Sequence, residues 1–186
     1  MTGARLRAGS AADWASCWAM DVAYTTDHVW QLQVHPLGES RSAALTRVRL
    51  PRPITLKDPL WGGEPALAQF QTDGALVVAE RDGGSVGFAV LLDDHARNVS
   101  AMPMLAVSPY ARRQGIGTML LAECVASAQT RARRALTVTV PARNDPAILF
   151  LQRAGFAMAG YDEQYYAAND VAVFFAYRLR GGDRGL

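Results

Sequence analysis

The stretch that most constrains the fold runs from Leu105 to Leu120 and reads LAVSPYARRQGIGTML. It begins with apolar residues typical of a strand, continues through a proline-marked turn and a loop with two glycines, and ends in a helical pattern. From Ile116, apolar residues recur at the spacing of one helix face, at Leu120, Cys124 and Ala128. The sequence therefore predicts a strand, a glycine loop and a helix in direct succession.

The loop between this strand and this helix has the features of an anion site. The first amides of a helix lack intrahelical partners and lie at the positive end of the helix dipole, and glycine lets an anion approach the backbone. Two other phosphate loops are excluded. A dinucleotide fingerprint needs a third glycine where this chain has Leu120, and a Walker loop needs a lysine, whereas Lys57 is the only lysine. On this stretch alone, an ordinary strand-to-helix turn remains the alternative.

Length and composition are those of a single globular domain. The chain has 186 residues, of which 50% are hydrophobic and 19% charged, and its net charge is +2. No signal-peptide layout and no apolar run of membrane-spanning length appear in the sequence, so we expect a cytoplasmic protein with no membrane partner. Cys17 and Cys124 fall on apolar helical faces, which favours buried thiols, and no Cys/His spacing indicates a metal site.

One basic cluster, RARR at 131–134, follows the predicted motif helix. Cations are favourable at a helix C-terminus, so we expect the cluster to cap this helix. No aromatic residues interleave with it, and we therefore expect no nucleic-acid partner.

The rest of the chain predicts a mixed α+β domain around one largely antiparallel sheet. Strands are predicted at 5–8, 75–81, 86–92, 99–107, 136–140 and 171–177, the last of these within a hairpin over 161–179, and helices at 10–24, from 116, and at 146–154. Asp27, His28 and Trp30 are expected in a turn or a second short helix. A hairpin is predicted over 31–34 and 42–50, and the prolines and glycines of 51–65 should prevent long elements. Pro103 lies inside a predicted strand and implies a bulge or an edge.

Two segments resemble the cofactor-binding motifs of the GNAT superfamily of N-acetyltransferases. The first resembles the family's acetyl-CoA loop and reads Arg112-x-x-Gly115-x-Gly117, preceded by Leu105-x-Val107-x-Pro109. The second runs from Asn144 to Phe156 and resembles the family's Asn-x-x-Ala…Gly-Phe segment. The resemblance implies one N-acetyltransferase domain over 1–186, with a divergent acceptor-side part at 1–75 and a cofactor-binding core at 76–179. It also implies the GNAT-like fold, a mixed, largely antiparallel sheet with splayed central strands and flanking helices.

The same resemblance implies that acetyl-CoA is the cofactor and lies between two splayed strands. Backbone groups of Leu105, Ala106 and Val107 would bond the pantetheine arm, and Asn144 would bond the cofactor from the facing segment. The pyrophosphate loop would comprise Arg112, Arg113, Gln114, Gly115, Ile116, Gly117 and Thr118.

Two catalytic positions depart from the family pattern. Leu151 stands where many relatives have a tyrosine that protonates the leaving thiolate, and Met104 stands where many have a glutamate base. A thiol with a pKa of about 8.5 leaves without acid help, and general acid catalysis is typically worth about 10²–10⁴ in rate, so the first loss is tolerable.

Other residues are candidates for these roles. Asp94, at a strand end, is the candidate base, and Tyr161 and Tyr165 are the candidate acids. His28 and His35 fall in the irregular part of the pattern and are interpreted as non-catalytic. Transfer of the proton through water is the alternative.

An acceptor pocket is predicted in the first third of the chain. Tyr24, Asp27 and Trp30 would form an aromatic and acidic wall suited to a cationic amine. The tail from Gly160 to Leu179 is similar to tails of streptothricin-type antibiotic acetyltransferases, which makes a polyamine-like antibiotic a candidate acceptor.

These observations predict an acetyl-CoA-dependent N-acetyltransferase that acts on the primary amine of a small molecule by direct attack. Two alternatives remain open: acetylation of protein N-termini or lysines, and an acyl-CoA-binding sensor that has lost catalysis. Relatives commonly form homodimers, and the residues do not decide whether this chain does.

Overall fold

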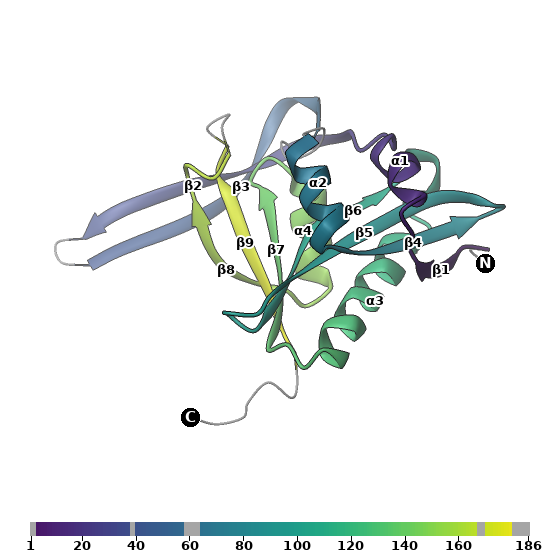
Figure 1. Cartoon of the computed structure of the whole chain (residues 1–186). Coiled ribbons are helices and arrows are strands. Elements are labelled where there is room, and N and C mark those ends of the chain that lie inside the picture. Colours follow the sequence, from purple (N-terminus) through teal and green to yellow (C-terminus); the bar gives the residue numbers. More distant parts are fainter. Residues whose placement is uncertain (1–2, 38–39, 58–63, 167–169, 180–186) are drawn as a thin grey trace. The chain divides into compact units, whose positions relative to one another are not determined.

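The computed structural model describes residues 3–37, 40–57, 64–166 and 170–179. Its strands form a seven-stranded sheet in the order β1-β4-β5-β6-β7-β9-β8 and a separate two-stranded ribbon, β2-β3 (Figure 1). In chain order the elements are β1 (Arg5–Ala8), α1 (Asp13–Trp18), β2 (Tyr24–Leu37), β3 (Ser40–Leu56), α2 (Glu64–Asp73), β4 (Ala75–Arg81), β5 (Gly84–Asp94), β6 (Val99–Val107), the 3₁₀ turn η1 (Pro109–Ala111), α3 (Ile116–Thr130), β7 (Ala135–Pro141), α4 (Asp145–Arg153), β8 (Ala157–Asp162) and β9 (Ala172–Arg178).

The chain divides into two compact units. The first comprises Met1–Val22, Leu60–Val138 and Ala176–Leu186, and the second comprises Ala23–Pro59 and Thr139–Phe175. The first unit holds β4, β5, β6 and α3, and the second holds the ribbon, α4 and β8. The division of the chain into an acceptor-side part and a cofactor core at residue 75 stays a prediction.

In the first unit, helices cover both faces of the sheet. Trp14 of α1 and Phe70 of α2 belong to one apolar cluster with Phe88 of β5. Successive strand residues point to opposite faces, so the preceding residue, Gly87, faces away from this cluster. A Cβ at Gly87 would lie 3.2 Å from the Leu120 side chain of α3, which shows how closely α3 packs on that face.

Most of the predicted strands and the motif helix are confirmed. Strands 5–8, 75–81 and 99–107 have the predicted bounds, and α3 begins at Ile116. The bulge expected at Pro103 is present: the ladder pairs Val90 with Met104 and then Leu92 with Ala101, so two residues of β6 face one of β5.

The first part of the chain differs from the prediction. The helix predicted over 10–24 is limited to α1, and Asp27, His28 and Trp30 lie in β2 rather than in a turn or helix. Because β2 pairs with β3 from Tyr24 onwards, cross-strand hydrogen bonding replaces the local helical pattern.

The prolines of 51–65 do not end β3 as predicted. The ribbon pairs Thr26 with Ile54 and then His28 with Arg49, so 50–53 face only one residue of β2. Pro51 and Pro53 therefore sit where the ladder is interrupted, which is where a strand tolerates a proline.

Both cysteines are buried free thiols, as predicted. Burial raises the pKa of Cys17 to about 11 and that of Cys124 to about 12. Among the described residues, no helix is long and apolar enough to cross a membrane.

Candidate functional site

The loop before α3 presents free backbone donors. Gly115 is the N-cap of α3, with a left-handed φ of 83°, and the first helical hydrogen bond runs from the Met119 amide to the Gly115 carbonyl (3.0 Å). Within the described residues, the amides of Ile116, Gly117 and Thr118 have no acceptor. These three N–H groups are therefore free donors at the start of a helix, the arrangement that suits an anion.

Two neighbouring arginines of this loop have different environments. The Arg112 Nε donates to the Val107 carbonyl at 2.9 Å, so this side chain fastens the loop to the end of β6. It also occupies one of the backbone acceptors predicted to bond the pantetheine arm. Arg113 is exposed, has a left-handed φ of 62°, and has no side-chain partner among the described residues. Arg113 is thus the loop arginine available to an anion.

A third arginine beside the loop was not found from the sequence. Arg81, at the end of β4, donates through one terminal nitrogen to the Gln114 Oε1 at 2.7 Å. Its guanidinium carbon lies 5.9 Å from the centre of the Tyr110 ring, which is 68% exposed. In the described part of the chain, Arg81 has no carboxylate partner. No local signal identifies Arg81, because 33 residues separate it from Gln114.

Strand β6 has an open edge next to this loop. Its parallel ladder with β7 is limited to Val99, Ala101 and the residue between them. From Met102 to Val107 the described ladders pair β6 with β5 alone. Backbone groups on the other edge are therefore available to a ligand arm, except for the Val107 carbonyl, which Arg112 occupies. Contacts of Leu105, Ala106 and Val107 with the pantetheine arm stay a prediction.

Two catalytic positions differ from the family pattern, and the side chains at both positions are buried. Met104 is 4% exposed in the apolar cluster of the first unit, and Leu151 is 1% exposed on α4. Neither position carries a group that transfers a proton.

Asp94, the candidate base, lies at the far end of β6 from Leu105. It pairs with Val99, six residues before Leu105, which corresponds to about 20 Å along a strand. Its carboxylate accepts a hydrogen bond from the Arg97 amide at 2.9 Å and stabilises the hairpin turn. We therefore do not retain Asp94 as the base.

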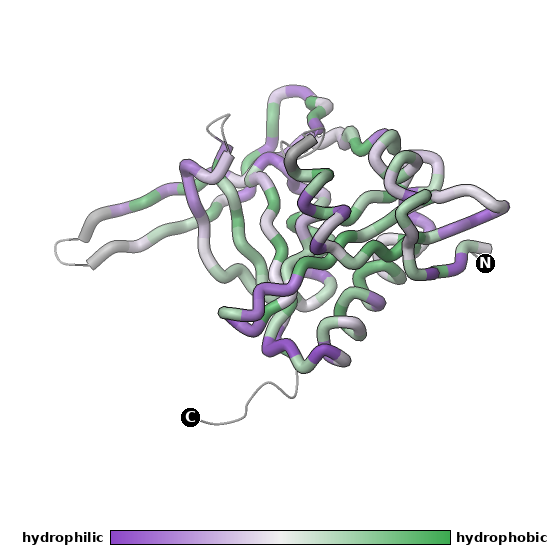
Figure 2. The backbone as a smooth tube through the Cα atoms, in the orientation of Figure 1, coloured by the Kyte–Doolittle hydropathy of each residue, from purple (hydrophilic) through white to green (hydrophobic). Residues whose placement is uncertain are grey.

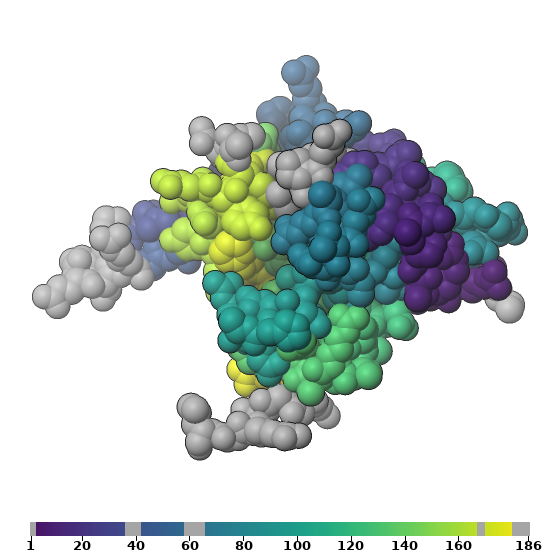
Figure 3. Space-filling model, viewed as in Figure 1, coloured from purple at the N-terminus to yellow at the C-terminus, as the bar shows by residue number. Residues whose placement is uncertain are grey.

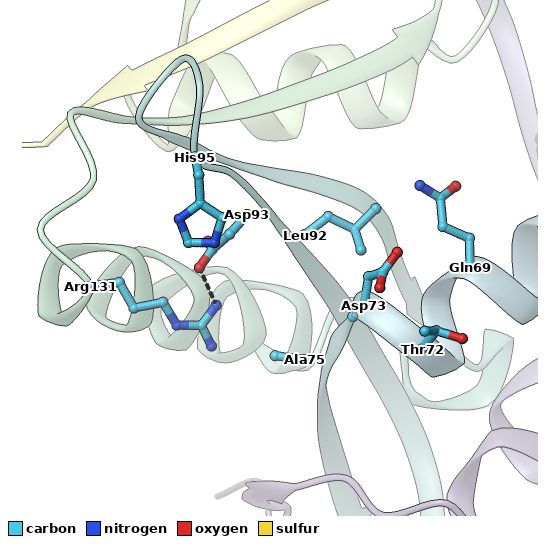
Figure 4. Close-up of a pocket in the computed structure, with 9 residues that line it drawn as sticks. Gln69, Thr72, Asp73, Ala75, Leu92, Asp93, His95 and Arg131 are labelled. Atoms are coloured by element: carbon cyan, nitrogen blue, oxygen red, sulfur yellow. Dashed lines mark ion pairs between the residues drawn. The ribbon is translucent and has the colours of Figure 1, made fainter.

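A polar cavity of about 600 Å³ opens at this same end of the sheet (Figure 4). Asp73 of α2 lines one side, and Asp93, His95 and Arg131 line the other. The Asp93 carboxylate accepts from the Ser100 hydroxyl at 2.7 Å and lies 3.4 Å from Arg131. Burial raises the pKa of Asp93, but these hydrogen bonds and arginine charges outweigh burial and hold it below its usual value. This carboxylate is satisfied within the protein.

The basic cluster at 131–134 ends α3 through its backbone: Arg131 is the C-cap, and the amides of Arg131 and Arg133 donate to the Ser127 and Ala128 carbonyls at 3.2 and 3.0 Å. Two of its arginine side chains bind the neighbouring hairpin. Arg133 donates to Asp93 at 2.9 Å, and the Arg134 Nε donates to the Arg97 carbonyl at 2.9 Å. These side chains therefore bind the turn between β5 and β6. Figure 2 shows both segments as hydrophilic, and in Figure 3 they lie side by side on the surface.

In the second unit, a buried carboxylate fastens the ribbon to α4. Asp145 is 4% exposed and accepts from the Trp30 indole at 2.9 Å and from two nitrogens of Arg47 at 2.7 and 2.9 Å. Burial raises the pKa of Asp145, but the hydrogen bonds from Arg47 and Trp30 outweigh it, so the pKa lies below its usual value. Trp30 is therefore fixed by its indole N–H.

The other residues predicted for the site also lie in the second unit. Tyr24 is half-buried opposite Leu56 in the ribbon, and the Asp27 carboxylate is bonded to His28. The Asn144 Oδ1 accepts from the Ala147 amide at 3.2 Å and caps α4.

The two candidate acids lie on β8 and just beyond it. Tyr161 is half-buried near the end of β8, and Tyr165 is 46% exposed. The Tyr165 ring meets Tyr166 and Phe174 edge-to-face, with centroids 5.0 and 5.7 Å apart.

Comparison with known proteins gives a family match and similar structures. Residues 72–158 match the family model of the acetyltransferase (GNAT) domain. Nourseothricin acetyltransferase is 26% identical and superposes with a TM-score of 0.79, over 96% of this chain and 99% of that one. No curated protein sequence matches the chain.

Two further solved structures share the fold and contain the cofactor. A Bacillus anthracis str. Ames protein described as a streptothricin acetyltransferase, in complex with acetyl coenzyme A, has 17% identity and a TM-score of 0.73, over 94% and 97% of the two chains. An Elizabethkingia anophelis GNAT family acetyltransferase with acetyl-CoA bound has 16% identity and a TM-score of 0.59, over 81% and 98%. The mixed sheet flanked by helices agrees with these matches. Residues 72–158 are therefore similar to the acetyltransferase (GNAT) domain, and nearly the whole chain is similar to nourseothricin acetyltransferase.

Proposed function

We propose that this protein transfers the acetyl group of acetyl-CoA to the primary amine of a small molecule. The observation that carries the proposal is the row of free amides at Ile116, Gly117 and Thr118, beside Arg113 and Arg81. A diphosphate needs both N–H donors and positive charge, and this end of α3 offers both. When bound, acetyl-CoA supplies the acetyl thioester that a neutral amine attacks.

The similarity to nourseothricin acetyltransferase, at 26% identity, favours a small-molecule acceptor. Nourseothricin acetyltransferase, named for an antibiotic, matches this chain over nearly its whole length, ribbon included. We infer that Tyr24 and Trp30 line the acceptor site and that Asn144 contacts the cofactor. We infer also that Tyr161 or Tyr165 protonates the leaving thiolate. Tyr161 and Tyr165 can each be replaced with phenylalanine in turn. Only the replacement of the tyrosine that donates the proton should lower kcat.

Titration calorimetry with coenzyme A tests the cofactor site directly. The wild-type protein should bind, and Gly117→Glu should abolish binding because its carboxylate occupies the place of the diphosphate. Ala126→Glu is the matched control, since it adds the same charge at an exposed position further along α3. Absence of binding by the wild type, or equal binding by Gly117→Glu, would contradict the proposal.

Release of the CoA thiol in the presence of a panel of amines tests the reaction. An acetyltransferase releases thiol faster when its acceptor is present. A sensor that has lost catalysis binds acetyl-CoA and shows no such dependence, and a protein acetyltransferase responds to peptides rather than to small amines.

A further inference from the structure

We propose that His28, oriented by Asp27, accepts the proton of the acceptor amine. This inference rests on the proposed function. Transfer to an amine needs a proton acceptor, because an alkylammonium with a pKa of about 10 has no lone pair at neutral pH. The family position for a glutamate base is Met104, whose side chain is buried in the core. A base supplied by this chain would therefore have to stand at another position.

The contact between Asp27 and His28 fixes which ring nitrogen carries the proton. The Asp27 Oδ1 lies 2.7 Å from the His28 Nδ1. An ionised carboxylate only accepts hydrogen bonds, so Nδ1 carries the hydrogen and Nε2 of the neutral ring holds a free lone pair. A carboxylate that orients an imidazole in this way is the arrangement used by general-base histidines on unrelated folds.

The backbone holds this pair at an interruption of the ribbon. The Thr26 hydroxyl donates to the His28 carbonyl at 2.6 Å and accepts from the His28 amide at 3.1 Å. On the opposite strand, residues 50–53 face Asp27 alone. Irregular pairing of this kind re-aims side chains and is common next to active sites. The His28 side chain is 19% exposed and that of Asp27 is 51% exposed, so the ring is sheltered while its partner stays in solvent.

The histidine shares a face of the ribbon with residues assigned to the site. His28 and Trp30 are two apart in a continuous stretch of the ladder, so both point to the same side. The Trp30 indole is bonded to Asp145, at the start of α4 and adjacent to Asn144. His28 and Trp30 thus lie on β2, and Asn144 precedes α4. The buried carboxylate of Asp145 joins these two elements.

Charged groups around the ring come from three elements and balance. Asp27 lies beside it on β2, Arg49 lies opposite it on β3, and Arg47 of β3 is paired with Asp145 of α4. Two carboxylates and two guanidinium groups therefore lie on the elements next to His28.

The proposed step balances as follows. The His28 Nε2 takes a proton from the ammonium and becomes imidazolium, and the released nitrogen lone pair forms the new C–N bond. The C–S bond breaks and its electron pair stays on sulfur. The nitrogen loses its second proton as the amide forms, and a tyrosine or water relays one proton to the thiolate, so that the products are the amide, the CoA thiol and one proton. The imidazolium then returns its proton to solvent.

Nuclear magnetic resonance of ¹⁵N-labelled histidine in the full-length protein tests the geometry without turnover. We expect a neutral His28 ring protonated at Nδ1. Asp27→Asn should shift the ring towards the Nε2-protonated tautomer, because the anionic acceptor is lost. A wild-type ring already protonated at Nε2 overturns the proposal.

Kinetics test the role of the ring. His28→Gln should lower kcat by about 100-fold, because the acceptor amine loses its proton acceptor. Its dissociation constant for coenzyme A should stay within two-fold of the wild-type value. His35→Gln, which removes an exposed histidine from the same strand, should behave as the wild type. Asp27→Asn should lie between the wild type and His28→Gln.

Failure of this inference is distinguishable from failure of the proposed function. If the wild type and the His28→Gln variant are equally active, the proposed role of His28 is wrong and the proposed function still holds. A wild type that binds coenzyme A but responds to no amine overturns the proposed function. Calorimetric binding of coenzyme A by each variant shows that the variant is folded.

Discussion

Arg113 adopts a backbone conformation that side chains other than glycine rarely take, with a φ of 62°. In the left-handed region the Cβ approaches the carbonyl oxygen, which costs an ordinary residue about 1 kcal/mol or more. This strained conformation places the charge of Arg113 next to the free amides of α3, in the proposed cofactor site.

Replacing Arg113 with glycine separates strain from charge. Arg113→Gly should raise the free energy of unfolding by about 1 kcal/mol, whereas Arg113→Ala should leave it nearly unchanged. Both variants lose the same charge and should bind coenzyme A several-fold more weakly. Urea unfolding and calorimetry measure the two effects. Equal stability of the two variants would show that no strain is stored at this residue.

Asp13 makes the stability of the first unit sensitive to acid. Its carboxylate accepts from Arg7 at 2.6 and 2.9 Å and from the Ser10 hydroxyl at 2.8 Å, and these hydrogen bonds hold its pKa well below the usual range. A carboxyl with a depressed folded-state pKa contributes stability above its unfolded pKa of about 3.9, and this stability is lost as the pH falls below that value.

Asp13→Asn should therefore lower the free energy of unfolding at pH 7 and flatten its decline between pH 5 and pH 2. Chemical unfolding at a series of pH values measures this. Glu163→Gln, at an exposed position, is the control and should keep the wild-type slope. If the free energy of unfolding of Asp13→Asn falls with pH as steeply as that of the wild type, other carboxyl groups cause the loss of stability in acid.

Among individual residues, the sequence predicted those whose role depends only on local backbone conformation. Gly115 of the predicted glycine loop is the N-cap of α3, and Pro103 lies in the expected bulge. Contacts between distant residues were not predictable. Arg81 reaches Gln114 only because the β4–β5 hairpin returns to the loop. The pair formed by Asp27 and His28 depends on an extended strand that was expected to be a turn or helix.

The ribbon is the element that depends most on a single contact. The Trp30 amide donates to the Ala142 carbonyl at 2.9 Å, and the Trp30 indole and Arg47 bind Asp145. An isolated two-stranded ribbon is only marginally stable in water. Asp145 therefore supplies stability that the ribbon lacks by itself.

Asp145→Asn should weaken this attachment. The amide keeps one acceptor and loses the charge that Arg47 binds, so we expect a loss of about 2 kcal/mol in the free energy of unfolding. Faster hydrogen exchange at the ribbon amides should accompany it. Asp162→Asn, an exposed replacement in the same unit, is the control. Unchanged exchange in the ribbon would show that its backbone contacts suffice.

Regular elements were predictable where one period dominates the sequence. Strands β4 and β6 and helix α3 alternate or recur cleanly, and their predicted bounds or start agree with the structure. The ribbon was only partly predicted, because its prolines lie where strand β3 departs from its partner. Proline content alone cannot show that a strand resumes after such an interruption.

For the whole molecule, ligand binding should appear as thermal stabilisation. A ligand that binds only the folded state, at a hundred times its dissociation constant, adds about 2.7 kcal/mol. For a chain of this length that corresponds to an increase in Tm of about 5 °C or more. Acetyl-CoA should produce this shift in the wild type and in Ala126→Glu, but not in Gly117→Glu. Differential scanning calorimetry measures it, and an equal shift in Gly117→Glu would place the ligand elsewhere.

The family motifs predicted the overall architecture, whereas length alone suggested only one domain. Elements of the second unit come from two distant parts of the chain, Ala23–Pro59 and Thr139–Phe175. No local pattern links these segments, because their association depends on long-range contacts such as that between Arg47 and Asp145.

The two buried cysteines have a practical consequence for labelling. Thiols with pKa values of about 11 and about 12 are almost wholly protonated at neutral pH, and burial keeps reagents away from them. A cysteine introduced at an exposed ribbon position, such as Val34→Cys, should therefore take up a maleimide dye selectively while both native cysteines are retained. Fluorescence from that dye would follow the ribbon as cofactor and acceptor are added.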